Sequence, residues 1–239
     1  MRFVDTHIHL QNFNIPAEEV ISLLRQTGVD KCICISATED DWKKVGNLAQ
    51  KFPQTVIPAF AVHPWHATTP QSGWQERLEQ KLKDFPQALI GECGLDLLKG
   101  AEISLQQKVF EEHIALAKQY NRPLLLHMVK AWSLLNDYLK ILPQPFVFHS
   151  FNGSSEMLRQ IIKHNGYIAI NAKILQTKHA EEVIKSVPKN RLLLETDAPY
   201  QTKISDLPIL CEKIALIRGE RVEETAENVY NNSLRIINL

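Results

Sequence analysis

Short apolar runs alternate with longer amphipathic segments along the whole chain. The apolar runs are rich in β-branched residues and predict eight strands, over 3–8, 31–36, 56–62, 88–92, 123–127, 146–149, 166–170 and 191–195. The segments between them carry apolar residues at helical spacing. For example, Val20, Leu23 and Leu24 share one face of the segment 18–27. The pattern therefore predicts strands and helices in alternation.

Capping residues mark the beginnings of several of these helices. Ser104 followed by Gln107 forms a capping box, which predicts the start of a helix. Ser154 or Ser155 can cap another helix further along the chain. His113 lies within the first of these helices and is expected to face the solvent.

The alternation of elements decides between two kinds of α/β fold. Strands that alternate with helices imply right-handed crossovers and a parallel sheet. Eight such units in 239 residues predict a single-domain (β/α)₈ barrel of the TIM type over residues 1–239. The alternative is an open doubly wound sheet, which would bind a ligand at its switch point. The polar residues described next favour the barrel, because strands at opposite edges of an open sheet could not meet at one site.

Potential metal ligands stand at the carboxyl ends of five predicted strands. The first strand carries His7 near its end and is followed by His9, and the period of two in a strand places both on one side. The remaining candidates are Glu92, His127, His149 and Asp197. Imidazoles and carboxylates together suit one or two divalent ions, which could be Zn, Mn, Ni or Mg. We therefore expect a metal site at the C-terminal ends of the strands, with Glu92 able to bridge two ions.

Two of these residues are also candidates for catalysis, and a third candidate contacts substrate. Glu92 could instead pair with a lysine, but its two neighbouring glycines suit close approach to a metal. Asp197 could simply cap a turn, but it is predicted to bind metal and to accept a proton from the attacking water. His63 ends another strand and is predicted to contact the substrate, for example at a phosphate. Glu195 can hydrogen-bond one of the ligand histidines.

Five motifs spread along the chain carry a family resemblance. They are D-T-H-x-H at 5–9, A-V-H-P at 61–64, G-E-x-G-L-D at 91–96, H-S-F-x-G at 149–153 and E-T-D-A-P-Y at 195–200. With them the chain resembles the TatD family of metal-dependent deoxyribonucleases, within the amidohydrolase-like metal-dependent hydrolases. The resemblance implies a TIM-like barrel and hydrolysis of DNA phosphodiesters, often from a 3′ end. It also implies two ligand sets: His7, His9, Glu92 and Asp197 around one metal, and Glu92, His127 and His149 around a second.

Three segments depart from the pattern of that family. Residues 97–100 are L-L-K-G, where the family often has aromatic residues and an arginine. Residues 128–130 are M-V-K after the fifth-strand histidine, where an arginine is common, and the segment 201–206 lacks the usual basic stretch. These changes remove phosphate or base contacts and leave the predicted metal ligands in place. Metal-assisted hydrolysis is therefore better supported than DNA as the substrate.

Charge and cysteine content narrow the class of protein. Lysine plus arginine equals aspartate plus glutamate at 27 each, which argues against a broad basic face for duplex nucleic acid. Bound metal ions could still hold a few phosphates. The four cysteines show no zinc-ribbon or disulfide-scaffold spacing, the N-terminus has no secretory pattern, and no apolar run would span a bilayer. We therefore expect a cytoplasmic location.

The sequence thus predicts a metal-dependent hydrolase of phosphodiester bonds that uses a metal-activated water. DNA is the preferred substrate, and neither a membrane nor an obligatory protein partner is expected. Two alternatives remain open. The same barrel could hydrolyse an amide, a lactone or another small-molecule bond, or it could be a non-catalytic metal-binding protein. Related barrels often use a carboxylated lysine as the bridge between two metals. This chain has Glu92 in that place, which favours the nuclease over the other hydrolases.

Overall fold

Eight parallel strands form one sheet in chain order in the computed structural model, which describes residues 1–238. They are β1 (Phe3–Ile8), β2 (Val29–Ile35), β3 (Val56–Phe60), β4 (Leu89–Asp96), β5 (Leu124–Val129), β6 (Phe146–Phe148), β7 (Tyr167–Ile170) and β8 (Leu192–Leu194). Beyond the end of β8, the backbone N–H of Asp197 donates to the carbonyl of His7 at 2.8 Å. Ile8 also bridges Ala198 in parallel fashion. These contacts close the sheet, so the predicted barrel is confirmed and the open sheet is excluded.

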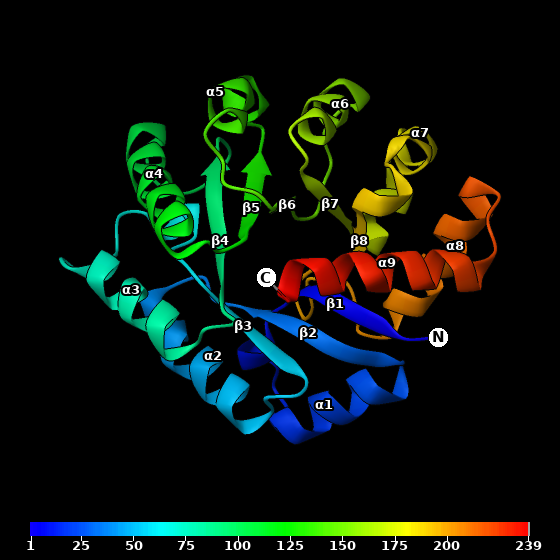
Figure 1. Cartoon of the computed structure of the whole chain (residues 1–239), viewed down its shortest axis with the longest axis horizontal. Coiled ribbons are helices and arrows are strands. Elements are labelled where there is room, and N and C mark those ends of the chain that lie inside the picture. The colour runs from blue at the N-terminus through cyan, green and yellow to red at the C-terminus, as the bar shows by residue number, and fades with distance from the viewer. Residues whose placement is uncertain (239) are drawn as a thin grey trace.

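Helices surround this ring of strands (Figure 1). The α-helices of the described chain are α1 (Ala17–Gln26), α2 (Glu39–Lys51), α3 (Trp74–Asp84), α4 (Ile103–Tyr120), α5 (Leu135–Leu139), α6 (Ser155–Lys163), α7 (Ala180–Ser186), α8 (Asp206–Arg218) and α9 (Val222–Ile237). Short 3-10 helices lie at Leu10–Asn12, Pro64–His66, Trp132–Leu134, Ala172–Gln176 and Lys189–Arg191. Within residues 1–238, no helix combines the length and the apolar character needed to cross a membrane. The predicted end of the domain, residue 239, lies outside the described residues.

The barrel has an interior core that is separate from the layer between strands and helices. Its members are Ile33, Ile35, Ile57, Ala59, Leu89, Leu125, Val147, Tyr167, Ala169, Leu193, Ile236 and Ile237. The last two come from α9, whose end lies near the centre of the ring and closes it (Figure 1). Two residues beyond Leu125 and Val147, the same inward positions hold His127 and His149. Because inward positions recur every two residues along a strand, a layer of imidazoles lies directly above the apolar core of the barrel.

Strand β4 extends to Asp96, four residues beyond the predicted end at residue 92. Two of its glycines permit close packing against β5. A Cβ at Gly91 would lie 2.5 Å from the Leu125 Cβ, and one at Gly94 would lie 2.1 Å from the His127 carbonyl oxygen. The sequence suggested that these glycines admit a metal. The structure shows instead that they let β4 and β5 approach closely enough to place Glu92 beside His127.

Several local predictions differ from the structure. Helix α4 begins at Ile103 with Glu102 as its N-cap and no side-chain capping bond, so the predicted capping box at Ser104 is wrong. Ser154 does cap α6, accepting a hydrogen bond from the Met157 N–H at 3.3 Å. Leu23 on α1 is 41% exposed and contributes little to the face predicted for it.

His113 on α4 is fully buried, which corrects the expectation that it faces solvent. Its Nδ1–H donates to the Val109 carbonyl at 2.7 Å, so its Nε2 is free to accept the Val62 backbone N–H at 3.1 Å. The backbone N–H of Val62, just beyond β3, is thus hydrogen-bonded to a side chain of helix α4. Burial lowers the pKa of His113 to about 4, and the bond to Val109 opposes this shift only in part.

His113 should make the protein less stable in mild acid. Its imidazole takes up a proton near pH 6.5 in the unfolded chain but only near pH 4 in the folded one. The unfolded state therefore binds more protons in this window, and the free energy of unfolding should fall by about 2 to 3 kcal/mol between pH 7 and pH 4.5 from this group alone. Urea titrations across this range should show a flatter pH dependence for His113→Gln. An unchanged slope in the variant would contradict the assignment.

Candidate metal centre

Glu92 stands at the centre of the polar cluster at the C-terminal end of the barrel. Its Oε1 lies 2.6 Å from the Nδ1 of His127 on β5 and 2.6 Å from the Nε2 of His149 after β6. Its Oε2 lies 3.2 Å from the Nε2 of His7 on β1. One carboxylate thus touches imidazoles delivered by three other strands, as parallel strands that end in one ring allow.

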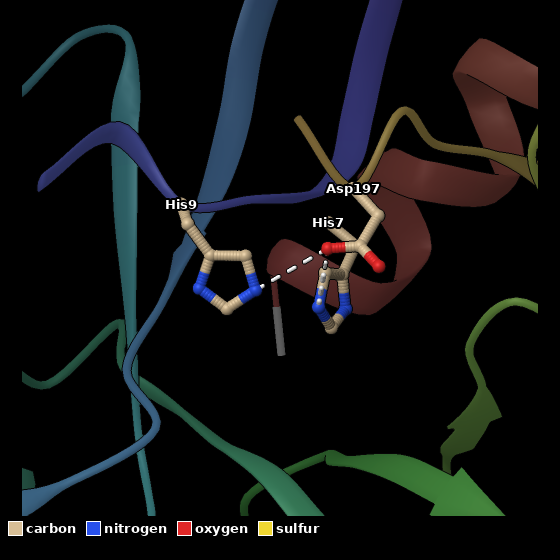
Figure 2. Close-up of side chains that lie close together, drawn as sticks. All are labelled: His7, His9 and Asp197. Atoms are coloured by element: carbon tan, nitrogen blue, oxygen red, sulfur yellow. Dashed lines mark ion pairs between the residues drawn. The ribbon is translucent and has the colours of Figure 1, made fainter. Parts of the chain in front are cut away.

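The second part of the cluster joins the two ends of the sheet. Figure 2 shows the imidazoles of His7 and His9 beside the carboxylate of Asp197. The Asp197 Oδ1 lies 3.3 Å from the His9 Nε2 and 3.9 Å from the His7 Nε2. Asp197 has a φ of +52°, a left-handed conformation that aspartate tolerates better than most residues. Since His7 also contacts Glu92, the structure brings all six predicted ligands into one cluster.

Hydrogen bonds fix which ring nitrogens face the site. The His9 Nδ1 lies 3.0 Å from the Ile35 carbonyl, which can only accept, so Nδ1 carries the hydrogen and Nε2 has the lone pair. The His127 Nε2 donates to the Asp96 Oδ2 at 3.1 Å, which leaves its Nδ1 with a lone pair. Burial would raise the pKa of Asp96, but the bonds from His127 and Trp65 lower it to about 2 and keep it an acceptor. Both histidines therefore present lone pairs to the cluster.

These lone pairs require a positive charge between them and the carboxylates. In the neutral tautomer, the His127 Nδ1 and the Glu92 Oε1 are two acceptors only 2.6 Å apart. Both ring nitrogens of His7 are buried without a hydrogen-bond partner. Within residues 1–238, no lysine or arginine forms an ion pair with Glu92, Asp96, Glu195 or Asp197. This donor set therefore fits a divalent cation, as buried charges require a partner or a metal.

The pKa values of the histidines report the same demand for positive charge. Burial on its own would lower the pKa of His149, yet Glu92 and Glu195 raise it well above its usual value. Burial likewise opposes protonation of His127, and hydrogen bonds to Asp96 and Glu92 overcome it and raise the pKa. The negative charge of the buried carboxylates can be balanced by protons on these rings or by a bound cation.

His63 differs from the other imidazoles in its tautomer. Its Nδ1 accepts the Trp65 backbone N–H at 3.1 Å, so the neutral ring carries its hydrogen on Nε2. That Nε2 lies 3.3 Å from the His127 Nδ1 and 3.4 Å from the Glu92 Oε1. Burial lowers the pKa of His63 to about 4, which keeps the ring neutral. His63 thus points a hydrogen-bond donor into the site, which suits an anionic oxygen.

Further polar residues support the cluster, and the sequence did not single out most of them. Asp5 accepts hydrogen bonds from the Thr196 N–H at 3.0 Å and the Thr196 hydroxyl at 2.6 Å, tying β1 to the segment that carries Asp197. Gln201 donates its side-chain amide to the Asp197 Oδ2. The position of Asp5 in the D-T-H motif could have identified it as a supporting residue of the site. Gln201 offered none, because only the turn after β8 brings it back to Asp197.

Glu195 lies beside His149, but the predicted hydrogen bond between the two side chains is not formed. Its Oε1 accepts the Ser150 backbone N–H at 2.7 Å and stands 3.5 Å from the His149 Nδ1, too far for a hydrogen bond. Its Oε2 is buried without a partner. Three groups of side chains in residues 1–238 have potential ligand atoms within 4.8 Å of one another: His7, His9 and Asp197; His63, Glu92 and His127; and His7, His149 and Glu195. Glu195 therefore lies close enough to His7 and His149 to offer an oxygen beside their ring nitrogens.

Comparison with known proteins identifies the family. Residues 4–238 match the family model described as TatD related DNase. The chain belongs to the TatD family. A 3′-5′ ssDNA/RNA exonuclease TatD from Pantoea ananatis is 28% identical, over 93% of this chain and 93% of its own length. A deoxyribonuclease Tat-D from Schizosaccharomyces pombe is 27% identical over 92% of this chain and 86% of its own. A crystal structure of YjjV, a TatD homologue from Escherichia coli K12, matches with a TM-score of 0.90 and 28% identity over 100% of this chain and 98% of that one. The protein is therefore a metal-dependent hydrolase of the TatD type, as the motifs had indicated.

Proposed function

We propose that this TatD protein hydrolyses phosphodiester bonds in DNA, with single-stranded DNA as its preferred form. The contact of one carboxylate, Glu92, with imidazoles from β1, β5 and β6 carries the proposal, because it can hold two cations near one substrate group. Family relatives described as a deoxyribonuclease and as an ssDNA/RNA exonuclease support the choice of bond and substrate.

The ligands divide into two sets that share Glu92. His7, His9, Glu92 and Asp197 would hold one divalent ion, and Glu92, His127 and His149 would hold a second. When bound, such ions neutralise charge on the phosphoryl group and lower the pKa of an attacking water. Nitrogen and oxygen donors in this mixture admit Zn, Mn, Ni or Mg.

Two residues act on protons and on the substrate directly. Asp197 accepts the proton of the attacking water at Oδ1, since its Oδ2 already accepts the Gln201 amide. His63 donates its Nε2–H to a non-bridging phosphate oxygen, because its Nδ1 is held as an acceptor by Trp65. A neutral donor is suited to this task over a wide pH range, since burial keeps the pKa of His63 near 4.

A cytoplasmic location and a single domain over residues 1–239 are part of the same proposal. The four cysteines are all buried and form no disulfide, which suits a reducing compartment.

A panel of substrates tests the proposed bond and the metal dependence together. Purified protein is incubated with a single-stranded DNA decamer, bis(p-nitrophenyl) phosphate, and a set of amides and lactones, each with and without a chelator. We expect hydrolysis of both phosphodiesters, its loss on chelation and its recovery when metal is restored. His127→Ala and Asp197→Ala should be folded and nearly inactive. Turnover of an amide or lactone alone, or full activity of metal-free protein, would contradict the proposal.

A further inference from the structure

A lysine is held over an aromatic ring at the rim of the site. The Nζ of Lys99 lies 3.5 Å from the centroid of the Trp65 ring, within the range of a cation–π interaction. The same ring lies 4.8 Å from the ring of His63 and 6.0 Å from that of His127. Lys99 is exposed and Trp65 is 39% exposed. An ammonium group is therefore fixed at the mouth, on the side of the proposed second ion.

Asp96 builds this pair and orients a predicted metal ligand at the same time. Its Oδ2 accepts the Trp65 Nε1–H at 2.6 Å and the His127 Nε2–H at 3.1 Å. Its Oδ1 accepts the backbone N–H of Lys99 at 3.0 Å. A Cβ at Gly100 would lie 2.9 Å from the Trp65 Cα, so the segment that carries Lys99 packs directly on Trp65. The rim pair and the imidazole of His127 are therefore placed by one carboxylate.

The ammonium of Lys99 has no anionic partner in the described chain. Among residues 1–238, Lys99 forms no ion pair, although Asp96 is its close neighbour through the backbone. The oxygens of Asp96 are already used by N–H donors, so the carboxylate does not compete for the ammonium. An ammonium that lies on an aromatic face at an exposed position, without a carboxylate partner, can bind an anion on its solvent side.

Resting on the proposed function, we propose that Lys99, held over Trp65, binds the phosphate next to the scissile one on the side of His63 and His127. Lysine binds phosphate as a point charge, and the ring restricts where that charge can lie. The residue would then favour polynucleotides over small phosphodiesters. In a chain of zero net charge, this lysine supplies positive charge close to His63 and His127.

Lys99→Ala tests the proposal through a ratio of two substrates. The single-stranded decamer has a phosphate next to the scissile one, whereas bis(p-nitrophenyl) phosphate has none. We expect the ratio of kcat/KM for the decamer to that for the small diester to fall by about fivefold, the upper end for one exposed ion pair, through a higher KM. Lys118→Ala, at the exposed far end of α4, is the matched control and should keep the wild-type ratio.

Salt dependence of binding gives a second readout that needs no turnover. The affinity for a fluorescein-labelled decamer is measured at several salt concentrations, and the slope of log K against log salt should become shallower by about 0.7 in Lys99→Ala, as for one lost phosphate contact. An unchanged slope together with an unchanged substrate ratio would overturn the proposal. A wild-type protein that cleaves neither phosphodiester would refute the proposed function instead, while the slope still decides the role of Lys99.

Trp65→Leu separates the phosphate contact from base stacking. If the ring acts by placing Lys99, Trp65→Leu should reproduce the loss seen in Lys99→Ala, and the double variant should lose no more than either single one. A loss from Trp65→Leu that remains undiminished when Lys99 is already alanine would show that the ring acts independently of Lys99, by stacking on a base or through its bond to Asp96, and would overturn the assignment.

Discussion

Replacing Glu92 by glutamine should reduce the hydrolysis of single-stranded DNA by about a thousandfold at saturating metal. Glu92 is the carboxylate that contacts His7, His127 and His149 together. Glutamine keeps the size of the side chain but removes its charge. It also presents N–H groups to nitrogen lone pairs that need a cation. Initial rates on the decamer, measured over a range of metal concentrations, test this expectation.

The matched control is Glu223→Gln, an exposed glutamate in the first turn of α9 at the opposite end of the barrel. It should have wild-type rates, and both variants should keep the far-UV circular dichroism of the wild type. A Glu92→Gln variant within tenfold of the wild-type rate would exclude Glu92 from the role assigned to it.

Gly94→Ala should be the most destabilising small substitution in the site. A Cβ there would lie 2.1 Å from the His127 carbonyl oxygen, and that backbone atom cannot turn aside as a side chain would. The φ of +138° is also poorly accessible to alanine. Separating β4 from β5 breaks the sheet where Glu92 meets His127. We expect the free energy of unfolding to fall by about 3 to 5 kcal/mol, or the variant to be insoluble.

Gly219→Ala distinguishes the effect of the steric clash at Gly94 from the effect of its positive φ. Gly219 has a φ of +65° after α8, and a Cβ there would meet nothing within 4 Å. This substitution should cost about 1 kcal/mol, the price of a left-handed alanine. Urea denaturation of the two variants gives the comparison. Equal losses would show that the close approach of β4 and β5 is not what requires Gly94.

The convergence of the six predicted ligands in one cluster was predictable because it depends on topology. Apolar runs of short length gave the eight strands, and a closed parallel barrel delivers all their carboxyl ends to one ring. His7, Glu92 and Asp197 could therefore be grouped without any knowledge of side-chain positions. The strand over 3–8 has the predicted bounds. The apolar residues of this segment favour a strand over other secondary structures.

Features that depend on one tertiary contact were not predictable. The length of β4 was underestimated because glycine has a weak strand preference, and only the close approach of the His127 backbone explains why Gly94 stands there. His113 was taken as exposed because its partner, the backbone N–H of Val62, is distant in sequence. In the sequence, Lys99 only marked a departure from the family pattern, because it lies in the segment where the family often has aromatic residues and an arginine. Its place over Trp65 depends on how Asp96 folds the following loop.

The central claim is that this buried cluster holds divalent metal through Glu92. Calorimetric titration of metal-free protein with Mn²⁺ tests it most directly. The wild type should bind one or two ions per chain at saturation, and Glu92→Gln should bind with affinity reduced by about tenfold or more. A wild type without saturable binding, or equal affinities in the two proteins, would contradict the claim.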